Sequence, residues 1–128
     1  MTVKYKVIRM AQPGVTGGGS YQYYPRVHQR SKIKLKELSQ IISRRCTLHS
    51  ADILATLTAL VEEIPELLLD NYSVELGELG IFSLHVKGLP AATPEQVNKT
   101  NISEVKMAFR PSLVIKDKLR LAHFSREQ

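Results

Sequence analysis

Residues 74–82, VELGELGIF, decide the fold of this 128-residue chain. Alternating apolar residues stand on both sides of Gly77 and Gly80, which predicts two short strands joined by a bend. A second stretch, FRPSLVIK at residues 109–116, joins a strand pattern to a helical one, with Ser112 as the expected N-cap. Between the two stretches lies a polar excursion, residues 87–103. We therefore expect two strands, a long excursion, a returning strand and a short final helix.

Two helices are predicted ahead of these strands. The first begins at Leu35 and has apolar residues at helical spacing on one face. The second runs from about Ser50 to Leu69. Its apolar stripe is wide enough to be buried on two sides, one of them by another subunit. Pro65 lacks a backbone donor, so we expect a kink near residues 61–65 or a helix broken there.

Another pair of strands is predicted at the N-terminus. Residues 2–10 alternate, and residues 21–30 are rich in strand-forming side chains but contain Pro25, which favours an edge strand. Gly17-Gly18-Gly19-Ser20 lacks the Lys-Ser/Thr of a phosphate-binding loop and is interpreted as a linker. The predicted organisation is an N-terminal β extension (1–33), a main domain (34–121) and a C-terminal tail (122–128), in the α+β class.

The charges are segregated along the chain. Residues 1–49 contain ten basic side chains and one acidic, residues 50–80 seven acidic and no basic, and residues 81–128 eight basic and four acidic. The net charge is +6. Such segregation predicts an acidic face and basic faces on the folded protein, and a basic balance suggests a polyanionic partner.

Other classes of function find little support in the sequence. Cys46-x-x-His49 has neither the further ligands of a zinc site nor an assembled catalytic base, so we expect a structural role, no metal, no cofactor and no enzyme activity. The single cysteine suits a reducing compartment. No apolar run is long enough to span a membrane, and the first ten residues lack the apolar core of a signal peptide. We expect a cytoplasmic protein without a small-molecule substrate.

The two stretches, in this order after two helices, resemble the bacterial HU and integration-host-factor family of histone-like proteins. That family has a V-x-L-x-G-F-G-x-F-like turn and an F-x-P-[GS]-x-x-[LV]-[KR]-like helix start, and the resemblance covers about residues 34–121. The N-terminal extension is similar to that of HU-like variants from Bacteroidetes. The resemblance implies a three-stranded antiparallel sheet with an extended β-arm, an intertwined homodimer, and largely sequence-independent binding of double-stranded DNA in the nucleoid. It also implies arms in the minor groove that bend or compact the DNA.

The sequence departs from the family in the arm. Relatives have an Arg-Asn-Pro stretch among several arginines there, whereas residues 83–105 contain no arginine. Pro90 and Pro94 are the candidates for intercalation between base pairs. Phosphate contacts need only positive charge in the right region. The candidate DNA contacts are Lys34, Lys36, Lys87, Lys99, Lys106, Arg110, Lys116, Lys118 and Arg120.

Three interpretations stay open from the sequence. The first is DNA binding through the backbone. The second is a protein-interaction or structural module on the same fold, with weak or no DNA binding because the arm arginines are missing. RNA binding is the third, kept open by the tyrosines at Tyr21–Tyr24, although stacking platforms for single strands are not evident. The steepness of any salt dependence separates the first interpretation from the second.

Overall fold

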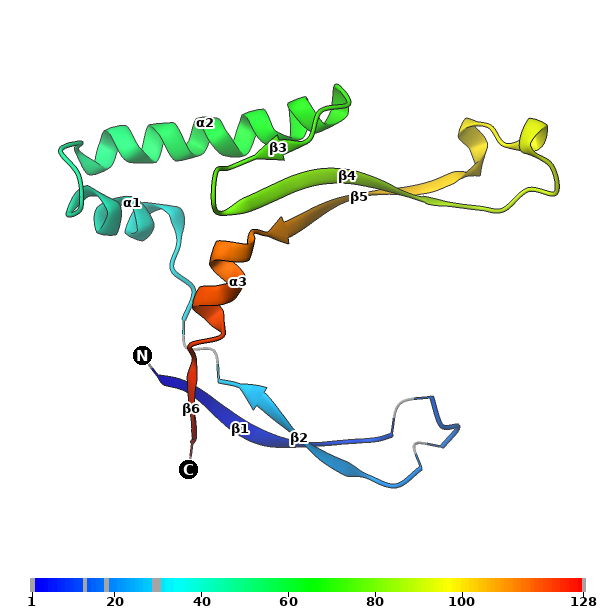
Figure 1. Ribbon diagram of the computed structural model, residues 1–128, viewed down its shortest axis with the longest axis horizontal. Coiled ribbons are helices and arrows are strands. Elements are labelled where there is room, and N and C mark those ends of the chain that lie inside the picture. Colours follow the sequence, from blue (N-terminus) through cyan, green and yellow to red (C-terminus); the bar gives the residue numbers. More distant parts are fainter. Residues whose placement is uncertain (1, 13, 18, 29–30, 128) are drawn as a thin grey trace. The chain divides into compact units, whose positions relative to one another are not determined.

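The structure is a computed structural model that describes residues 2–12, 14–17, 19–28 and 31–127. Within these residues the chain forms three α-helices and two three-stranded sheets (Figure 1), which confirms the α+β class. The contacts divide the chain into two compact units, residues 33–116 and residues 1–32 with 117–128. Predictions that involve Pro13, Gly18 and residues 29–30 lie outside the described residues.

Two helices open the larger unit. Helix α1 spans Leu35–Ser43 and helix α2 spans Ser50–Leu69. Ser39 is buried on α1, and its hydroxyl donates to the Lys36 carbonyl at 2.6 Å, so this buried polar group has a partner. Helix α2 continues through Pro65, so of the two outcomes expected there, a kink or a break into two helices, the break does not occur. Val61, whose carbonyl loses its helical donor to the proline, is 60% exposed, so water can replace that donor.

The sheet of this unit is antiparallel, as predicted. Strand β3 (Val74–Glu75) pairs with β4 (Gly80–Gly88), and β4 pairs with β5 (Ile102–Pro111). Gly80 has a φ of +151°, and a Cβ there would come within 2.3 Å of the Arg110 carbonyl oxygen. Only glycine fits this position, which explains why VELGELGIF turns where it does.

The connection between β4 and β5 is ordered by its own hydrogen bonds. It contains two 3₁₀ turns, Pro94–Gln96 and Lys99–Asn101. The Asn98 side chain accepts from the Thr100 amide at 2.9 Å, and the Asn101 side chain donates to the Leu89 carbonyl at 3.1 Å. Strands β4 and β5 extend from both ends into the polar excursion predicted over residues 87–103. The excursion is for this reason shorter than expected.

Helix α3 spans Leu113–Leu119 and begins at the predicted cap. The Ser112 hydroxyl accepts from the Ile115 amide at 3.3 Å and donates to the Glu78 carbonyl in the bend between β3 and β4. The Ser112 amide also donates to the Leu79 carbonyl at 3.2 Å. These hydrogen bonds hold the start of α3, which belongs to the second motif, against the bend of the first motif.

The smaller unit is built on a sheet with the strand order β2-β1-β6. The two predicted strands, β1 (Thr2–Met10) and β2 (Gln22–Val27), pair as an antiparallel hairpin, and Pro25 lies on an edge strand, as predicted. Strand β6 (His123–Arg126) pairs with β1 in parallel. The sequence assigned no pairing partner to the predicted tail, whereas the structure pairs its residues His123–Arg126 with β1.

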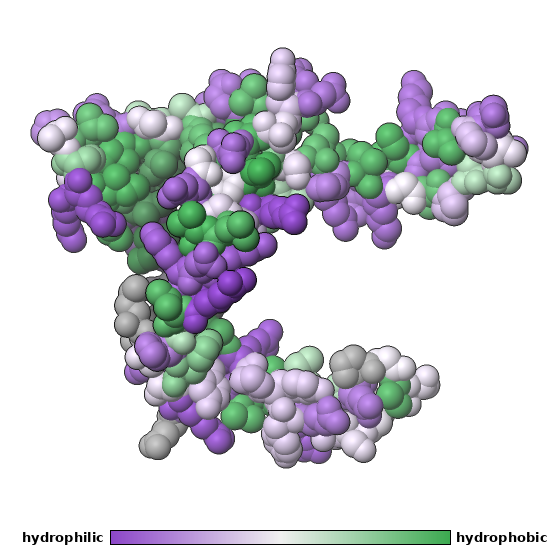
Figure 2. Space-filling model, viewed as in Figure 1, coloured by the Kyte–Doolittle hydropathy of each residue, from purple (hydrophilic) through white to green (hydrophobic). Residues whose placement is uncertain are grey.

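The core of the larger unit is small. Among the described residues, the buried apolar side chains are Ile53, Ile64 and Leu68, all on α2. Figure 2 shows exposed hydrophobic surface over the helices of this unit. One chain alone leaves much of its apolar surface in contact with water.

Candidate nucleic-acid interface

The hairpin formed by β4 and β5 has two faces of different character, because side chains alternate along each strand. Phe82 lies opposite Phe109, with ring centroids 4.8 Å apart, and the apolar pairs that follow lie on the same face. The other face, here called the polar face, carries the remaining pairs. Its pairs are Ile81 with Arg110, Ser83 with Ala108, His85 with Lys106, and Lys87 with Glu104.

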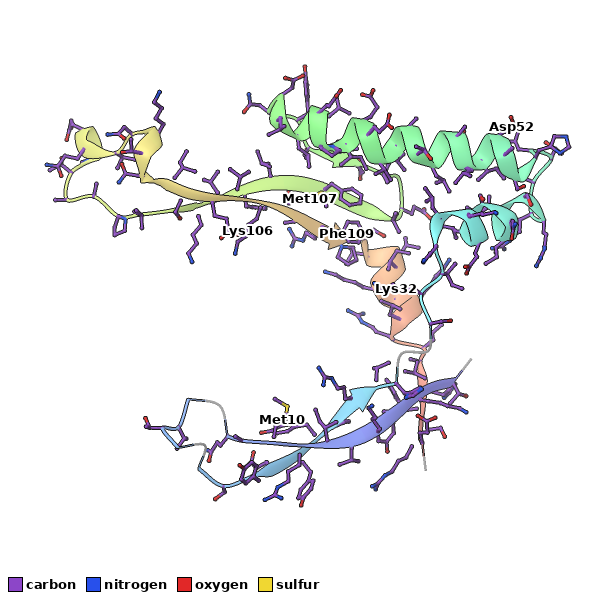
Figure 3. The ribbon with its side chains drawn as sticks, turned by 180° about the vertical axis from the view of Figure 1, so that it is seen from behind. Met10, Lys32, Asp52, Lys106, Met107 and Phe109 are labelled. Carbon is purple, nitrogen blue, oxygen red and sulfur yellow. The ribbon has the colours of Figure 1, made fainter. Side chains whose placement is uncertain are left out.

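Lys106 and Arg110 therefore lie on the face opposite Met107 and Phe109, as the alternation predicted. Figure 3 labels Lys106, Met107 and Phe109 along β5. The Lys106 ammonium lies 3.7 Å from the Glu104 carboxylate, and both side chains are more than half exposed, at 58% and 54%. An exposed pair of this kind contributes at most about 1 kcal/mol. Lys106 can exchange that partner for a phosphate at little cost.

Arg110 and Lys116 meet in a groove at the base of the hairpin. They line a hollow of about 400 Å³ with Gly80, Ser112 and Glu75 among its walls. Arg110 is supplied by β5 and Lys116 by α3, and the hydrogen bond from Ser112 fixes the start of α3 to the β3–β4 bend. Two cations beside one carboxylate leave this groove with a net positive charge, which suits a phosphate group.

The other predicted contacts are more scattered. Lys34 is the N-cap of α1 and Lys36 follows in its first turn, both exposed. Lys87 is exposed near the end of β4, opposite Glu104. Lys99 begins the second 3₁₀ turn of the hairpin tip. The structure does not bring these four side chains into one cluster with Arg110.

Lys118 and Arg120 belong to the smaller unit. Lys118 is on α3, whereas Arg120 lies one residue beyond the end of that helix. The helix stops at Leu119 and the chain then turns toward β6. The Arg120 guanidinium pairs with Asp117 at 3.1 Å.

Both candidate intercalating prolines are exposed at the hairpin tip. Pro94 opens the first 3₁₀ turn. Proline suits a first helical position because its missing donor would be unpaired there anyway, so Pro94 has a structural explanation. Pro90 has no such position in a turn. Leu89 and Val97, each 57% exposed, add apolar surface to the tip.

His85 was missed by the sequence analysis. It lies opposite Lys106 on the polar face, and its Nε2 atom is 3.1 Å from the Ser83 hydroxyl. The signal was present in the alternation of residues 82–86, in which Phe82, Leu84 and Val86 mark the opposite face.

The apolar face of the same unit contains a hollow between α2 and the sheet. Val61, Ile64 and Pro65 line it from the helix, and Phe82 and Met107 line it from the strands. Its volume is about 410 Å³. Met107 and Val61 are 57% and 60% exposed, so this apolar surface is open to water in the single chain.

Few features of the described residues suggest other chemistry. No group of three or more His, Cys, Asp or Glu side chains within them could hold a metal ion. Cys46 is exposed, and His49 is the N-cap of α2. Across the same part of the chain, the helices are too short or too polar to cross a membrane.

Comparison with known proteins defines the class. Residues 1–126 match the HU-HIG family, described as an HU domain fused to wHTH, Ig, or Glycine-rich motif. The chain therefore belongs to the HU-HIG family, and the resemblance predicted from the two motifs is confirmed. The match includes the N-terminal strands as well as the segment that carries the motifs.

The fold is also similar to solved structures, and one of these matches nearly the whole chain. It is that of a protein from Bacteroides vulgatus ATCC 8482 described as a candidate bacterial DNA binding protein, with a TM-score of 0.64 and 9% sequence identity. The similarity covers 98% of this chain but 49% of that protein, so the chain spans about half its length. At this identity the similarity concerns the fold. None of the curated proteins has a sequence that matches the chain.

Proposed function

We propose that this chain is a histone-like protein that binds double-stranded DNA through its backbone, largely independently of base sequence, at the bacterial nucleoid. Its membership of an HU family supports DNA binding. The observation that carries the proposal is that Arg110 and Lys116 line one groove. The polar face beside this groove also presents Lys106 and Lys87. Cations in this arrangement suit phosphates. They do not form a set of groups that would recognise the edges of particular bases.

The proposed assembly is a homodimer. The apolar hollow beside Val61 and Met107, together with a core of few buried side chains, favours a second copy of the chain as its cover. Exposed apolar surface of this extent is typical of an interface. We place the dimer contact on this face and DNA on the polar face, since the two lie on opposite sides of the hairpin.

DNA bending is a further part of the proposal. Pro90 is exposed at the hairpin tip, and Leu89 and Val97 give the tip an apolar surface that suits insertion between base pairs in the minor groove. Pro94 is the weaker candidate because it has a place in a 3₁₀ turn. Pro90→Ala is expected to reduce the bend angle measured by energy transfer between dyes at the ends of a duplex.

A protein-interaction module without a strong hold on DNA is the alternative. The observation that favours it is Glu104, which lies opposite Lys87 and within 3.7 Å of Lys106. This carboxylate removes much of the positive charge from the outer half of the polar face. On either proposal the chain acts by binding and not as an enzyme.

Fluorescence anisotropy on a labelled duplex of roughly 30 base pairs, longer than common DNA-binding sites, tests the choice. Backbone binding predicts an affinity that falls steeply with salt, by about 0.9 in the logarithmic slope for each phosphate neutralised. It also predicts similar affinities for duplexes of unrelated sequence. Absence of binding at low salt would exclude DNA binding and leave the interaction module.

A further inference from the structure

The smaller unit carries the positive charge of the chain. Residues 1–32 contain six basic and no acidic side chains, and residues 117–128 contain three basic and two acidic, a net charge of +7. The larger unit, residues 33–116, contains nine basic and ten acidic side chains, a net charge of −1. The segment with the two HU-like motifs thus has no surplus of positive charge.

Three cations of the smaller sheet, Lys4, Lys6 and Arg26, share one of its faces. Lys4 and Lys6 share a face of β1 because they are two residues apart. Arg26 on β2 lies directly opposite Lys6. Lys6 and Arg26 line a shallow groove of about 480 Å³ together with Val27 and His28.

The charges on this face are open to a partner. Lys4, Lys6 and Arg26 are all exposed, and none of them forms an ion pair with another residue that the structure describes. The acidic group on this side is Glu127, whose carboxylate is already 2.9 Å from the His28 ring. A face that only had to be soluble would mix both signs of charge.

The other face of the same sheet is mainly apolar, although Arg9 and Arg126 also lie on it. Tyr5, Val7, Val27 and Phe124 line a hollow there of about 650 Å³. Lys4, Lys6 and Arg26 therefore lie on the side of the sheet opposite the larger apolar hollow.

We propose that the basic face of the β2-β1-β6 sheet, centred on Lys6 and Arg26, is a second surface that contacts the phosphate backbone of duplex DNA. The proposal rests on the DNA binding proposed above and adds a contact surface outside the two motifs. Phosphate contacts require positive charge without a fixed base sequence, and an arginine can hold a phosphate with two hydrogen bonds. With a larger unit of net charge −1, this surface supplies much of the electrostatic attraction.

The experiment compares two variants that each lower the net charge by two. Lys6→Thr with Arg26→Thr removes the paired cations and keeps residues that favour strands. Arg44→Gln with Arg45→Gln removes two exposed cations just after α1. The first variant is expected to lower the logarithmic salt slope by about 1.8 and to weaken binding at low salt about tenfold or more. The control variant is expected to keep the wild-type slope.

A third variant separates the effect of charge on DNA binding from the effect of side-chain shape. Lys6→Arg with Arg26→Lys keeps both charges and is expected to keep the wild-type slope. If circular dichroism shows that the double threonine variant is unfolded, the single variants replace it, and each is expected to lower the slope by about 0.9.

Two results would overturn the proposal while leaving DNA binding intact. One is a folded Lys6→Thr, Arg26→Thr variant with an unchanged salt slope. The other is an equal fall for the Arg44 and Arg45 control, which would show that only total charge matters. Failure of the wild-type chain to bind DNA would instead overturn the function on which the proposal rests.

Discussion

The Ser112 hydroxyl donates a hydrogen bond to the backbone carbonyl of Glu78, thirty-four residues earlier in the chain. Ser112 belongs to FRPSLVIK and Glu78 to VELGELGIF, so the two motifs that identify the fold are in direct contact. The same hydroxyl accepts from the Ile115 amide and caps α3. One side chain therefore sets both the start of the helix and its place against the bend.

Ser112→Ala is expected to destabilise the protein by about 2 kcal/mol, because the change removes the helix cap and the hydrogen bond to Glu78 together. Urea unfolding followed by circular dichroism measures this loss. Ser112→Thr keeps the hydroxyl and serves as the control, with a stability close to that of the wild type. Equal losses in both variants would contradict the role of the hydroxyl.

Gly80→Ala is expected to cost about 3 kcal/mol, because its Cβ would collide with the Arg110 carbonyl and the Phe109 ring. Gly77 is the matched control. It has a φ of +51°, but its Cβ would meet open space, so Gly77→Ala should cost only about 1 kcal/mol of conformational strain. Thermal unfolding of the two variants tests whether Gly80→Ala is less stable than Gly77→Ala. A Gly77→Ala variant that is the less stable of the two would contradict the steric explanation.

Local patterns in the sequence predicted much of the larger unit. The alternation around Phe82 and Phe109 indicated which side chains share a face, and the register of β4 with β5 agrees. Strand β6 gave no such signal. Its four residues pair in parallel with β1 at the other end of the chain, and pairing of such distant short segments leaves no periodicity to detect.

The site was less predictable than the fold for a related reason. A count of charges along the chain assigns residues 1–32 and residues 117–128 to different segments. The two segments form one unit only in the folded structure. The partner of Lys106 is Glu104, two residues away on the same face of β5, which the alternation implied. The groove that unites Arg110 and Lys116 depends instead on the contact between Ser112 and Glu78, which no local pattern shows.

The wild-type chain is expected to sediment as a dimer, and Val61→Asp is expected to weaken that dimer. Val61 is 60% exposed in one chain, and a carboxylate buried by the second copy would lack a partner. A cost of about 3 kcal/mol would raise the dissociation constant roughly 150-fold. Val15→Asp is the control, since Val15 is 44% exposed in the loop between β1 and β2. An unchanged dissociation constant for Val61→Asp would exclude this face as the interface.

Replacement of Arg110 and Lys116 by glutamine is expected to lower the logarithmic salt slope for duplex DNA by about 1.8, because two phosphate contacts are lost. Adding Lys106→Gln should increase the fall to about 2.7. The Arg44→Gln, Arg45→Gln variant removes two charges away from the groove and should bind as the wild type does. Fluorescence anisotropy at several salt concentrations gives the slopes, and urea unfolding shows whether each variant is folded. A folded Arg110, Lys116 variant with the wild-type slope would mean that phosphates do not occupy this groove, and Glu104 would then account for a polar face without a strong hold on DNA.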